Sequence, residues 1–162
     1  MSIFLKTEDE IELMREANLL VGKTLAEVGR HVKPGVTTLQ LDKIAEEFIR
    51  DNGAIPTFKG YPSSYGPPFP GSICASVNDV VVHGVPSEDV VLKDVDIISV
   101  DCGTLLNGFN GDSCYTFCVG EVSEDVKKLL RTTKESLYKG IEVAQAGHHV
   151  GDIGQVIQDY CQ

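Results

Sequence analysis

The dipeptide Asn107-Gly108 constrains the fold more than any other feature of the sequence. It lies between two runs of alternating apolar and polar residues, 96–106 and 109–119. Asn-Gly favours a two-residue type I′ turn, because the backbone twist of this turn matches that of the flanking strands. The two runs are therefore predicted to form an antiparallel hairpin, and the turn fixes a register in which Leu106 faces Phe109.

This register gives two acidic residues a predicted position. Counting outward from the turn places Gly103 opposite Asp112 and Asp101 opposite Cys114. Asp101 and Asp112 then share one face as diagonal neighbours, with Cβ atoms about 7–8 Å apart or somewhat less. Among apolar neighbours both carboxylates would lose hydration and repel each other, and divalent cations bridged by the pair would relieve both costs. The alternative is that one Asp caps a turn and the other pairs with Lys93.

Helical periodicity accounts for most of the remaining chain. Apolar residues at helical spacing predict four helices, most of which begin after a capping residue and end near Gly or Pro. Their expected spans are 7–33, 37–52, 123–144 and 150 onward. Two short strands, Ser72–Val77 and Val80–Val82, are expected around a turn at Asn78-Asp79. With the hairpin they predict an α+β fold, in which helices pack on one face of an antiparallel sheet.

The segment 56–71 is rich in Pro and Gly, which predicts an irregular loop. A surface loop pinned by its rings and the rim of a binding pocket are both open interpretations. The rings belong to Phe58, Tyr61, Tyr65 and Phe69. His83, which follows the run of valines and precedes Gly84, is either a structural histidine or a proton-handling one.

Charge and composition exclude several classes of protein. The chain has 162 residues and a net charge of −10, which argues against a general binder of nucleic acid or anionic membranes. No apolar stretch approaches the roughly 20 residues that span a bilayer, and the N-terminus lacks the pattern of a signal peptide. A cytoplasmic protein is therefore expected, with its five cysteines as free thiols. Cys114 and Cys118 have no second pair of ligands for a structural zinc site.

These motifs closely resemble those of type I methionine aminopeptidases. Four segments carry the resemblance and follow the family's order: the KPG turn at 33–35, the SxCxSxN strand at 72–78, the HGVP segment at 83–86 and the pair Asp101 and Asp112. The resemblance implies a pita-bread fold, in which two related α/β halves surround a dinuclear metal centre. Residues 1–162 would then form a single incomplete domain that lacks the C-terminal half.

The resemblance also implies a reaction and a role for each matched residue. The family removes the N-terminal methionine from nascent polypeptides, using a water activated by two divalent ions. Asp101 and Asp112 would bind these ions, for which Co, Mn, Fe and Zn remain open, and His83 would handle a proton near the scissile amide. The other matched positions fall into two groups: Cys74, Tyr61 and Phe69 would line the methionine side-chain pocket, and Asn78 and Val80 would hold a monovalent cation.

The family adds a His and two Glu ligands from its C-terminal half, and nothing after Asp112 replaces them convincingly. We therefore expect this chain to be part of a longer enzyme and to be inactive alone. The last helix fits this expectation because it ends without a cap, although a frayed helix end is the alternative. Substrate N-termini would be the main partner, with ribosome association a further expectation and no nucleic acid or membrane partner. The alternatives are a non-catalytic half-length module that binds peptides or proteins and a relative of the Xaa-Pro aminopeptidases.

Overall fold

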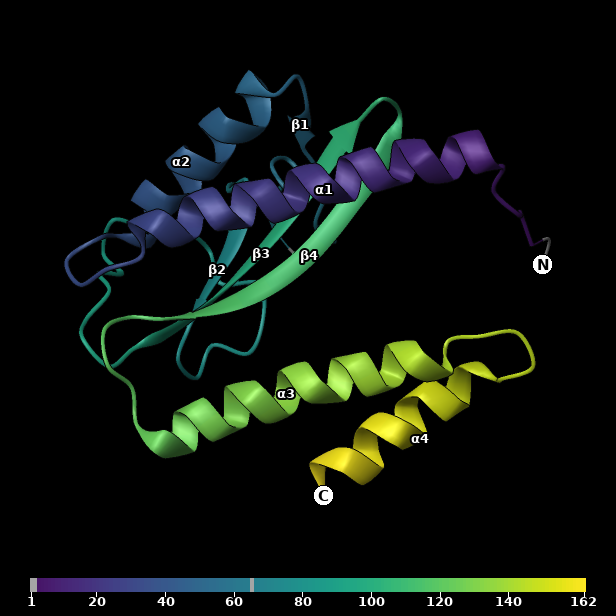
Figure 1. Ribbon diagram of the computed structural model, residues 1–162. Helices are drawn as coiled ribbons and strands as arrows, with labels where there is room; N and C mark the ends of the chain where they lie inside the picture. The colour runs from purple at the N-terminus through teal and green to yellow at the C-terminus, as the bar shows by residue number, and fades with distance from the viewer. Residues whose placement is uncertain (1–2, 65) are drawn as a thin grey trace. The chain divides into compact units, whose positions relative to one another are not determined.

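The computed structural model describes residues 3–64 and 66–162, and the chain divides into two compact units at Glu121–Val122. The first unit contains the helices α1 (Glu8–His31) and α2 (Thr38–Asp51) and the strands β1 (Ile55–Pro56), β2 (Ile73–Val77), β3 (Ile97–Leu106) and β4 (Phe109–Cys118). The second unit contains α3 (Glu124–Val143) and α4 (Val150–Cys161) (Figure 1). The predicted α+β class is confirmed, whereas the description of residues 1–162 as one incomplete domain stays a prediction.

The hairpin of β3 and β4 is the central element of the first unit, and its register is the predicted one. Leu106 pairs with Phe109, Gly103 with Asp112, and Asp101 with Cys114. Asn107 and Gly108 both have left-handed backbone, with φ of 52° and 82°, as a type I′ turn requires. Along its other edge β3 pairs antiparallel with β1 and β2, which completes a four-stranded sheet.

The helices α1 and α2 pack on one face of this sheet (Figure 1). Both begin with capping boxes, formed by Thr7 with Glu10 and by Thr37 with Gln40. On β3, the side chains that alternate toward the core are completely buried: Ile98, Val100, Cys102 and Thr104. The residues between them point to the opposite face because side chains on a strand alternate with period two.

The helix α1 approaches β4 so closely that the sheet has room only for glycine at position 111. A Cβ atom on Gly111 would lie 2.5 Å from the backbone oxygen of Ala17. The hydroxyl of Thr104 donates a hydrogen bond to the same oxygen at 3.1 Å. Beside it, the Asn18 side-chain oxygen accepts a hydrogen bond from the Asp112 N–H at 3.3 Å. α1 therefore fixes the backbone of β4 at the position of Asp112.

The predicted strand at Val80–Val82 is wrong, because this segment is irregular. After Asn78, whose φ is 52°, the chain leaves the direction of β2 and its valines are 45%, 88% and 63% exposed. It returns to β2 through one backbone hydrogen bond, from Ala75 N–H to Gly84 O at 2.8 Å. β-Branched residues favour strands only where a neighbouring strand pairs with them. The strand β1 was not predicted, because its two residues are too few to show alternation.

The second unit is a helical hairpin whose two helices pack through small residues. Gly140 of α3 faces α4, and a Cβ atom there would lie 3.0 Å from Ile157 Cδ1 and 3.3 Å from Ile153 Cγ2. Apolar residues of α4 therefore pack on α3. Lys139 lies over the ring of Tyr160, with its Nζ 4.7 Å from the ring centroid.

The five cysteines are free thiols, as expected. Within the described residues, no helix is both long enough and apolar enough to cross a membrane.

The close contact of α1 with β4 can be tested with two glycine substitutions. We expect Gly111→Ala to lower the free energy of unfolding by about 1–3 kcal/mol, because the methyl group would overlap backbone atoms of α1. Gly22→Ala is the matched control: Gly22 lies in α1 with open space around it, so this change should stabilise the chain by about 0.5–1 kcal/mol. Urea unfolding measures both, and equal effects would contradict the proposed contact.

Candidate metal and substrate site

A pocket of about 630 Å³ opens beside the sheet, which is within the usual size range of ligand sites. Nine residues line it: Phe58, Tyr61, Pro62, Ser63, Phe69, Cys74, His83, Asp101 and Asp112. The structure therefore brings together all six residues that the sequence predicted for metal, proton transfer or substrate binding. It adds Phe58, Pro62 and Ser63, which belong to the predicted aromatic loop but had not been selected.

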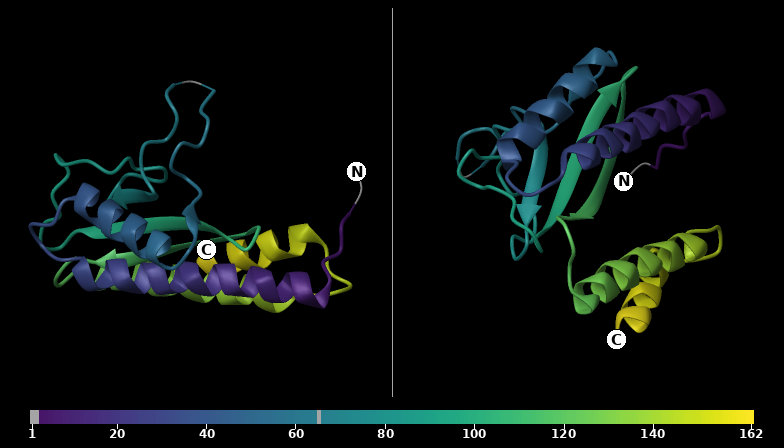
Figure 2. Two further views of the ribbon diagram at one scale, coloured as in Figure 1. Left: turned by 90° about the horizontal axis from the view of Figure 1, so that it is seen from above. Right: turned by 60° about the vertical axis from the view of Figure 1, so that its left-hand side comes forward.

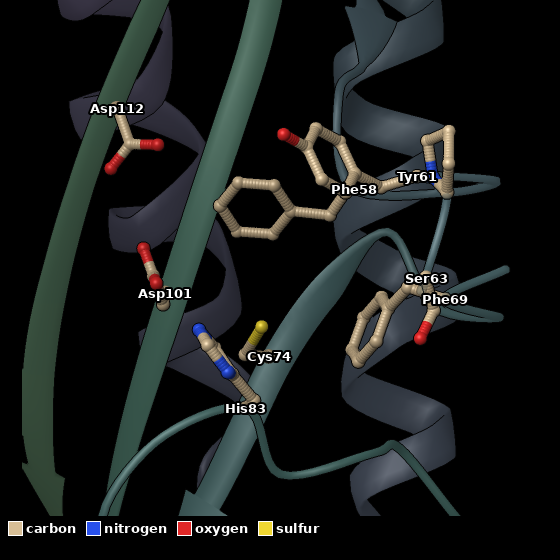
Figure 3. A pocket seen from close by; sticks show the side chains of 9 residues that line it. Phe58, Tyr61, Ser63, Phe69, Cys74, His83, Asp101 and Asp112 are labelled. Carbon is tan, nitrogen blue, oxygen red and sulfur yellow. The ribbon is translucent and has the colours of Figure 1, made fainter. Parts of the chain in front are cut away.

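The two acidic residues form one wall of this pocket (Figure 3). Asp101 projects from β3 and Asp112 from the neighbouring strand β4, as the hairpin register requires. Cys74 of β2 pairs directly with Asp101 on the other side, so that its thiol lies beside the carboxylate. His83 approaches the same area from the loop that follows β2 (Figure 3). Three segments, β2, β4 and the loop after β2, thus converge on Asp101 of β3.

Aromatic side chains form the opposite wall of the pocket. Phe58, Tyr61 and Phe69 come from the long loop between β1 and β2, which extends away from the strands (Figure 2). Its stem is held by backbone hydrogen bonds, from Gly60 N–H to Phe69 O at 2.8 Å and from Phe69 N–H to Tyr61 O at 3.0 Å. The loop is therefore a pocket rim, the second of the two interpretations left open by its sequence. Tyr65, the fourth ring of the loop, lies outside the described residues.

Gly103 explains how the aromatic loop reaches the acidic wall. A Cβ atom at this position would lie 2.3 Å from Thr57 Oγ1 and 2.8 Å from Phe58 Cε1. The missing side chain therefore makes room for the start of the loop between Asp101 and Asp112. Phe58, which lies against Gly103, is 45 residues away from it in the sequence. No local pattern could therefore have identified Phe58 as a pocket residue.

The backbone of His83 is in the left-handed region, with φ of 58°. Histidine enters this region more often than most residues, but such conformations still cost about 1–3 kcal/mol and persist only where the surroundings hold them. The conformation turns the imidazole toward Asp101, as Figure 3 shows. His83 is largely exposed, so its ring is accessible from the pocket.

The charges in the pocket favour a bound cation. Burial raises the pKa of the Asp101 carboxyl above its usual range, and repulsion from Asp112 raises it further. A hydrogen bond from the Cys102 backbone and the charge of His83 oppose this rise. Among the described residues, no Lys or Arg lines the pocket. Lys93, the alternative partner considered from the sequence, donates its backbone N–H to Asp96 in a turn at 2.8 Å.

The two thiols beside Asp101 are neutral at physiological pH. Burial raises the pKa of Cys74 to about 11, and the charge of Asp101 contributes to this rise. The pKa of Cys114 is likewise raised to about 11 by burial and by Asp101 and Asp112. A protonated thiol behaves as a small, polarisable apolar group. Cys74 is therefore suited to contact an apolar or thioether side chain in the pocket.

The pocket residues fit a divalent cation only in part. Carboxylate oxygens are suitable ligands for Mg²⁺, Mn²⁺ and related ions, and two of them face one space here. Within residues 3–64 and 66–162, however, no cluster of three or more His, Cys, Asp or Glu could hold a metal ion. The described residues thus offer two carboxylate ligands, which by themselves would bind a divalent ion weakly.

Asn78 and Val80, the predicted monovalent-cation residues, do not line the pocket. The Asn78 amide donates to Asp96 Oδ1 at 2.9 Å, and its oxygen accepts a hydrogen bond from Ile97 N–H at 3.0 Å. Val80 N–H donates to the backbone oxygen of Val77 at 3.1 Å. These contacts close the turn after β2, and the role of the two residues in binding a cation stays a prediction.

The raised pKa of Asp101 predicts how stability depends on pH. A carboxyl whose folded-state pKa exceeds its unfolded value, near 4, weakens the folded state once the pH rises above that value. In metal-free buffer, Asp101→Asn should therefore raise the thermal midpoint at about pH 7, and the gain should shrink toward about pH 4. Asp89→Asn, in an exposed loop, is the control and should show no such trend. A gain from Asp101→Asn that grew as the pH fell would contradict the assignment.

Comparisons of this chain with known proteins agree on one family. Residues 12–162 match metallopeptidase family M24. The chain is 50% identical over 160 residues to the methionine aminopeptidase of Clostridium acetobutylicum, covering 99% of this chain and 62% of that protein. It is 51% identical over 160 residues to methionine aminopeptidase 1 of Bacillus subtilis, again with 99% and 62% coverage.

Solved structures agree with the sequence relatives. The crystal structure of methionine aminopeptidase from Rickettsia prowazekii superimposes with a TM-score of 0.92 at 41% identity, and the match covers 98% of this chain and 62% of that one. This chain thus spans about 62% of the length of each of these three relatives. Since the family match extends over nearly the whole sequence and includes every residue of the pocket, the chain belongs to metallopeptidase family M24.

Proposed function

We propose that this chain carries part of the active site of a metal-dependent methionine aminopeptidase, which removes the N-terminal methionine from nascent polypeptides. The observation that supports this proposal most directly is the convergence of Asp101, Asp112 and His83 on one pocket with a largely apolar opposite wall. Two acids beside each other without a basic partner need a cation, and an apolar wall suits an uncharged side chain such as that of methionine. The relatives described above are methionine aminopeptidases, which supports the same activity.

In this proposal, Asp101 and Asp112 hold divalent metal. A bound divalent ion would polarise the scissile carbonyl and lower the pKa of a water that attacks it. The position of Asp101 between β2 and β4 holds its backbone in place, because both neighbouring strands pair with β3 at this residue. The proposal includes two metal ions, with Co, Mn, Fe and Zn as candidates.

His83 handles a proton near the scissile amide. Its imidazole faces the pocket beside Asp101, where it can donate to or accept from a substrate group bound at the metal side. Cys74, Tyr61 and Phe69 contact the methionine side chain, to which the neutral thiol and the rings offer polarisable apolar surface. These contacts would select for the first residue of the substrate and keep water away from its side chain.

The remaining parts of the proposal concern the cation, the partners and the compartment. A monovalent cation at Asn78 and Val80 would take mainly backbone oxygens, because the Asn78 side chain is already hydrogen-bonded. Nascent chain N-termini are the proposed substrate, which would bring the enzyme to the ribosome, and the cytoplasm is the proposed compartment. A non-catalytic peptide-binding module would have no need of two acids on one pocket wall, so we do not favour it.

The proposal is tested by methionine release. Since the chain spans 62% of the Bacillus subtilis relative, the assay uses a chimera in which these residues replace the matching segment of that protein. The chimera should release methionine from Met-Ala-Ser in the presence of Mn²⁺ or Co²⁺. His83→Ala should lower kcat/KM by about 10²–10⁴, the usual contribution of a proton-transfer group, and Asp112→Asn should also lower it strongly.

The controls distinguish two causes of a lower rate: the loss of a functional side chain and the misfolding of the chimera. Asp89→Asn should leave the rate unchanged, and circular dichroism should show that each variant folds. A folded chimera that hydrolyses an Xaa-Pro dipeptide in preference to Met-Ala-Ser would favour a proline-specific peptidase. A His83→Ala variant with the full rate would refute the assigned role of His83.

A further inference from the structure

We propose that Ser76 is a positioning residue for His83. It lies on β2 two residues after Cys74 and is 4% exposed, but it does not line the pocket. Its hydroxyl accepts a hydrogen bond from the Gly84 N–H at 3.1 Å. Because Gly84 directly follows His83, this bond acts on the backbone that directs the imidazole. The proposal rests on the proposed function in giving His83 a role, whereas the contact itself does not depend on that role.

The segment around His83 has few other restraints. Three residues before it, Val80 to Val82, are exposed and form no strand. His83 itself is exposed and has the left-handed backbone that only external contacts can maintain. The restraint must therefore come from the residues that follow, and Gly84 is the first of them to contact β2.

Gly84 is held against β2 through both of its backbone groups. Its oxygen accepts the Ala75 N–H at 2.8 Å, and its N–H donates to the Ser76 hydroxyl. The approach is so close that a Cβ atom on Gly84 would lie 2.2 Å from the oxygen of Ala75. A strand partner would supply the acceptor for such an N–H from its backbone. Here the serine hydroxyl takes that place, which lets the chain turn and present His83 to Asp101.

Removal of the hydroxyl has a defined consequence. In Ser76→Ala the Gly84 N–H loses its acceptor in a partly buried position, and one of the two bonds that hold the turn is gone. His83 can then relax toward a common backbone conformation, which swings its ring away from the acidic wall. Ser76→Thr keeps the hydroxyl and should keep the geometry.

Ser99 is a suitable matched control. It pairs directly with Ser76 across β2 and β3 and therefore lies on the same face of the sheet. Its hydroxyl bonds to that of Thr116 at 2.8 Å rather than to the loop. Ser99→Ala thus removes a neighbouring hydroxyl from the same face without touching the backbone of His83 or Gly84.

Nuclear magnetic resonance on the whole chain tests the proposal. In Ser76→Ala we expect amide hydrogen exchange at Gly84 to accelerate by about fivefold or more, the factor for one hydrogen bond of ordinary strength. The Cα and Cβ shifts of His83 should move away from left-handed values. Wild-type, Ser76→Thr and Ser99→Ala chains should agree with one another in both measurements. Unchanged exchange and shifts in Ser76→Ala, or equal changes in Ser99→Ala, would overturn the proposal.

Added Mn²⁺ reports the position of the His83 ring. A role of Ser76 in stability alone would not change this position. Mn²⁺ at the acidic wall should broaden the ring signals of His83 more than those of His31, which belongs to the same unit, and Ser76→Ala should reduce this difference at least severalfold. Ring broadening that stays at the wild-type level in Ser76→Ala would also overturn the proposal. If Mn²⁺ fails to broaden signals around Asp101 in the wild-type chain, the metal assignment fails, and the exchange and shift data still decide the role of Ser76.

Discussion

The register of the β3–β4 hairpin decides which side chains lie on each face of the sheet. The rest of the site depends on this assignment. On one face Gly111 admits the backbone of α1, which anchors β4 next to Asp112. On the other face Gly103 admits Thr57 and Phe58 between the two acids. Since side chains alternate along a strand, a slip of one residue in either strand would move the acid of that strand to the core face and separate the pair.

Much of this arrangement follows from local sequence. Asn107-Gly108 predicted the register, and with it the shared face of Asp101 and Asp112, because a two-residue turn permits only one pairing. Capping residues predicted the helix starts for the same local reason. What escaped prediction depends on distant partners. Phe58 lines the pocket only because Gly103 leaves space, and Val80–Val82 is irregular although its composition favours a strand.

The chemistry of the pocket arises from an unequal distribution of charge and polarity. One wall carries two carboxylates without a Lys or Arg lining the described pocket, and the other carries aromatic rings. Desolvation raises the pKa of Asp101 and that of Cys74, so the first wall suits a cation and the second suits an apolar side chain. His83 lies between them in a strained conformation, which is common where a fold positions a functional group.

The central claim is that Asp101 and Asp112 together bind divalent metal. Anomalous diffraction from a crystal grown with Co²⁺ tests it most directly, because the signal locates the ion without reference to activity. We predict a peak within coordination distance of both carboxylates, on the face that carries Cys74 and His83. A peak only at His148 and His149, or the absence of any peak between the two acids at saturating Co²⁺, would contradict it.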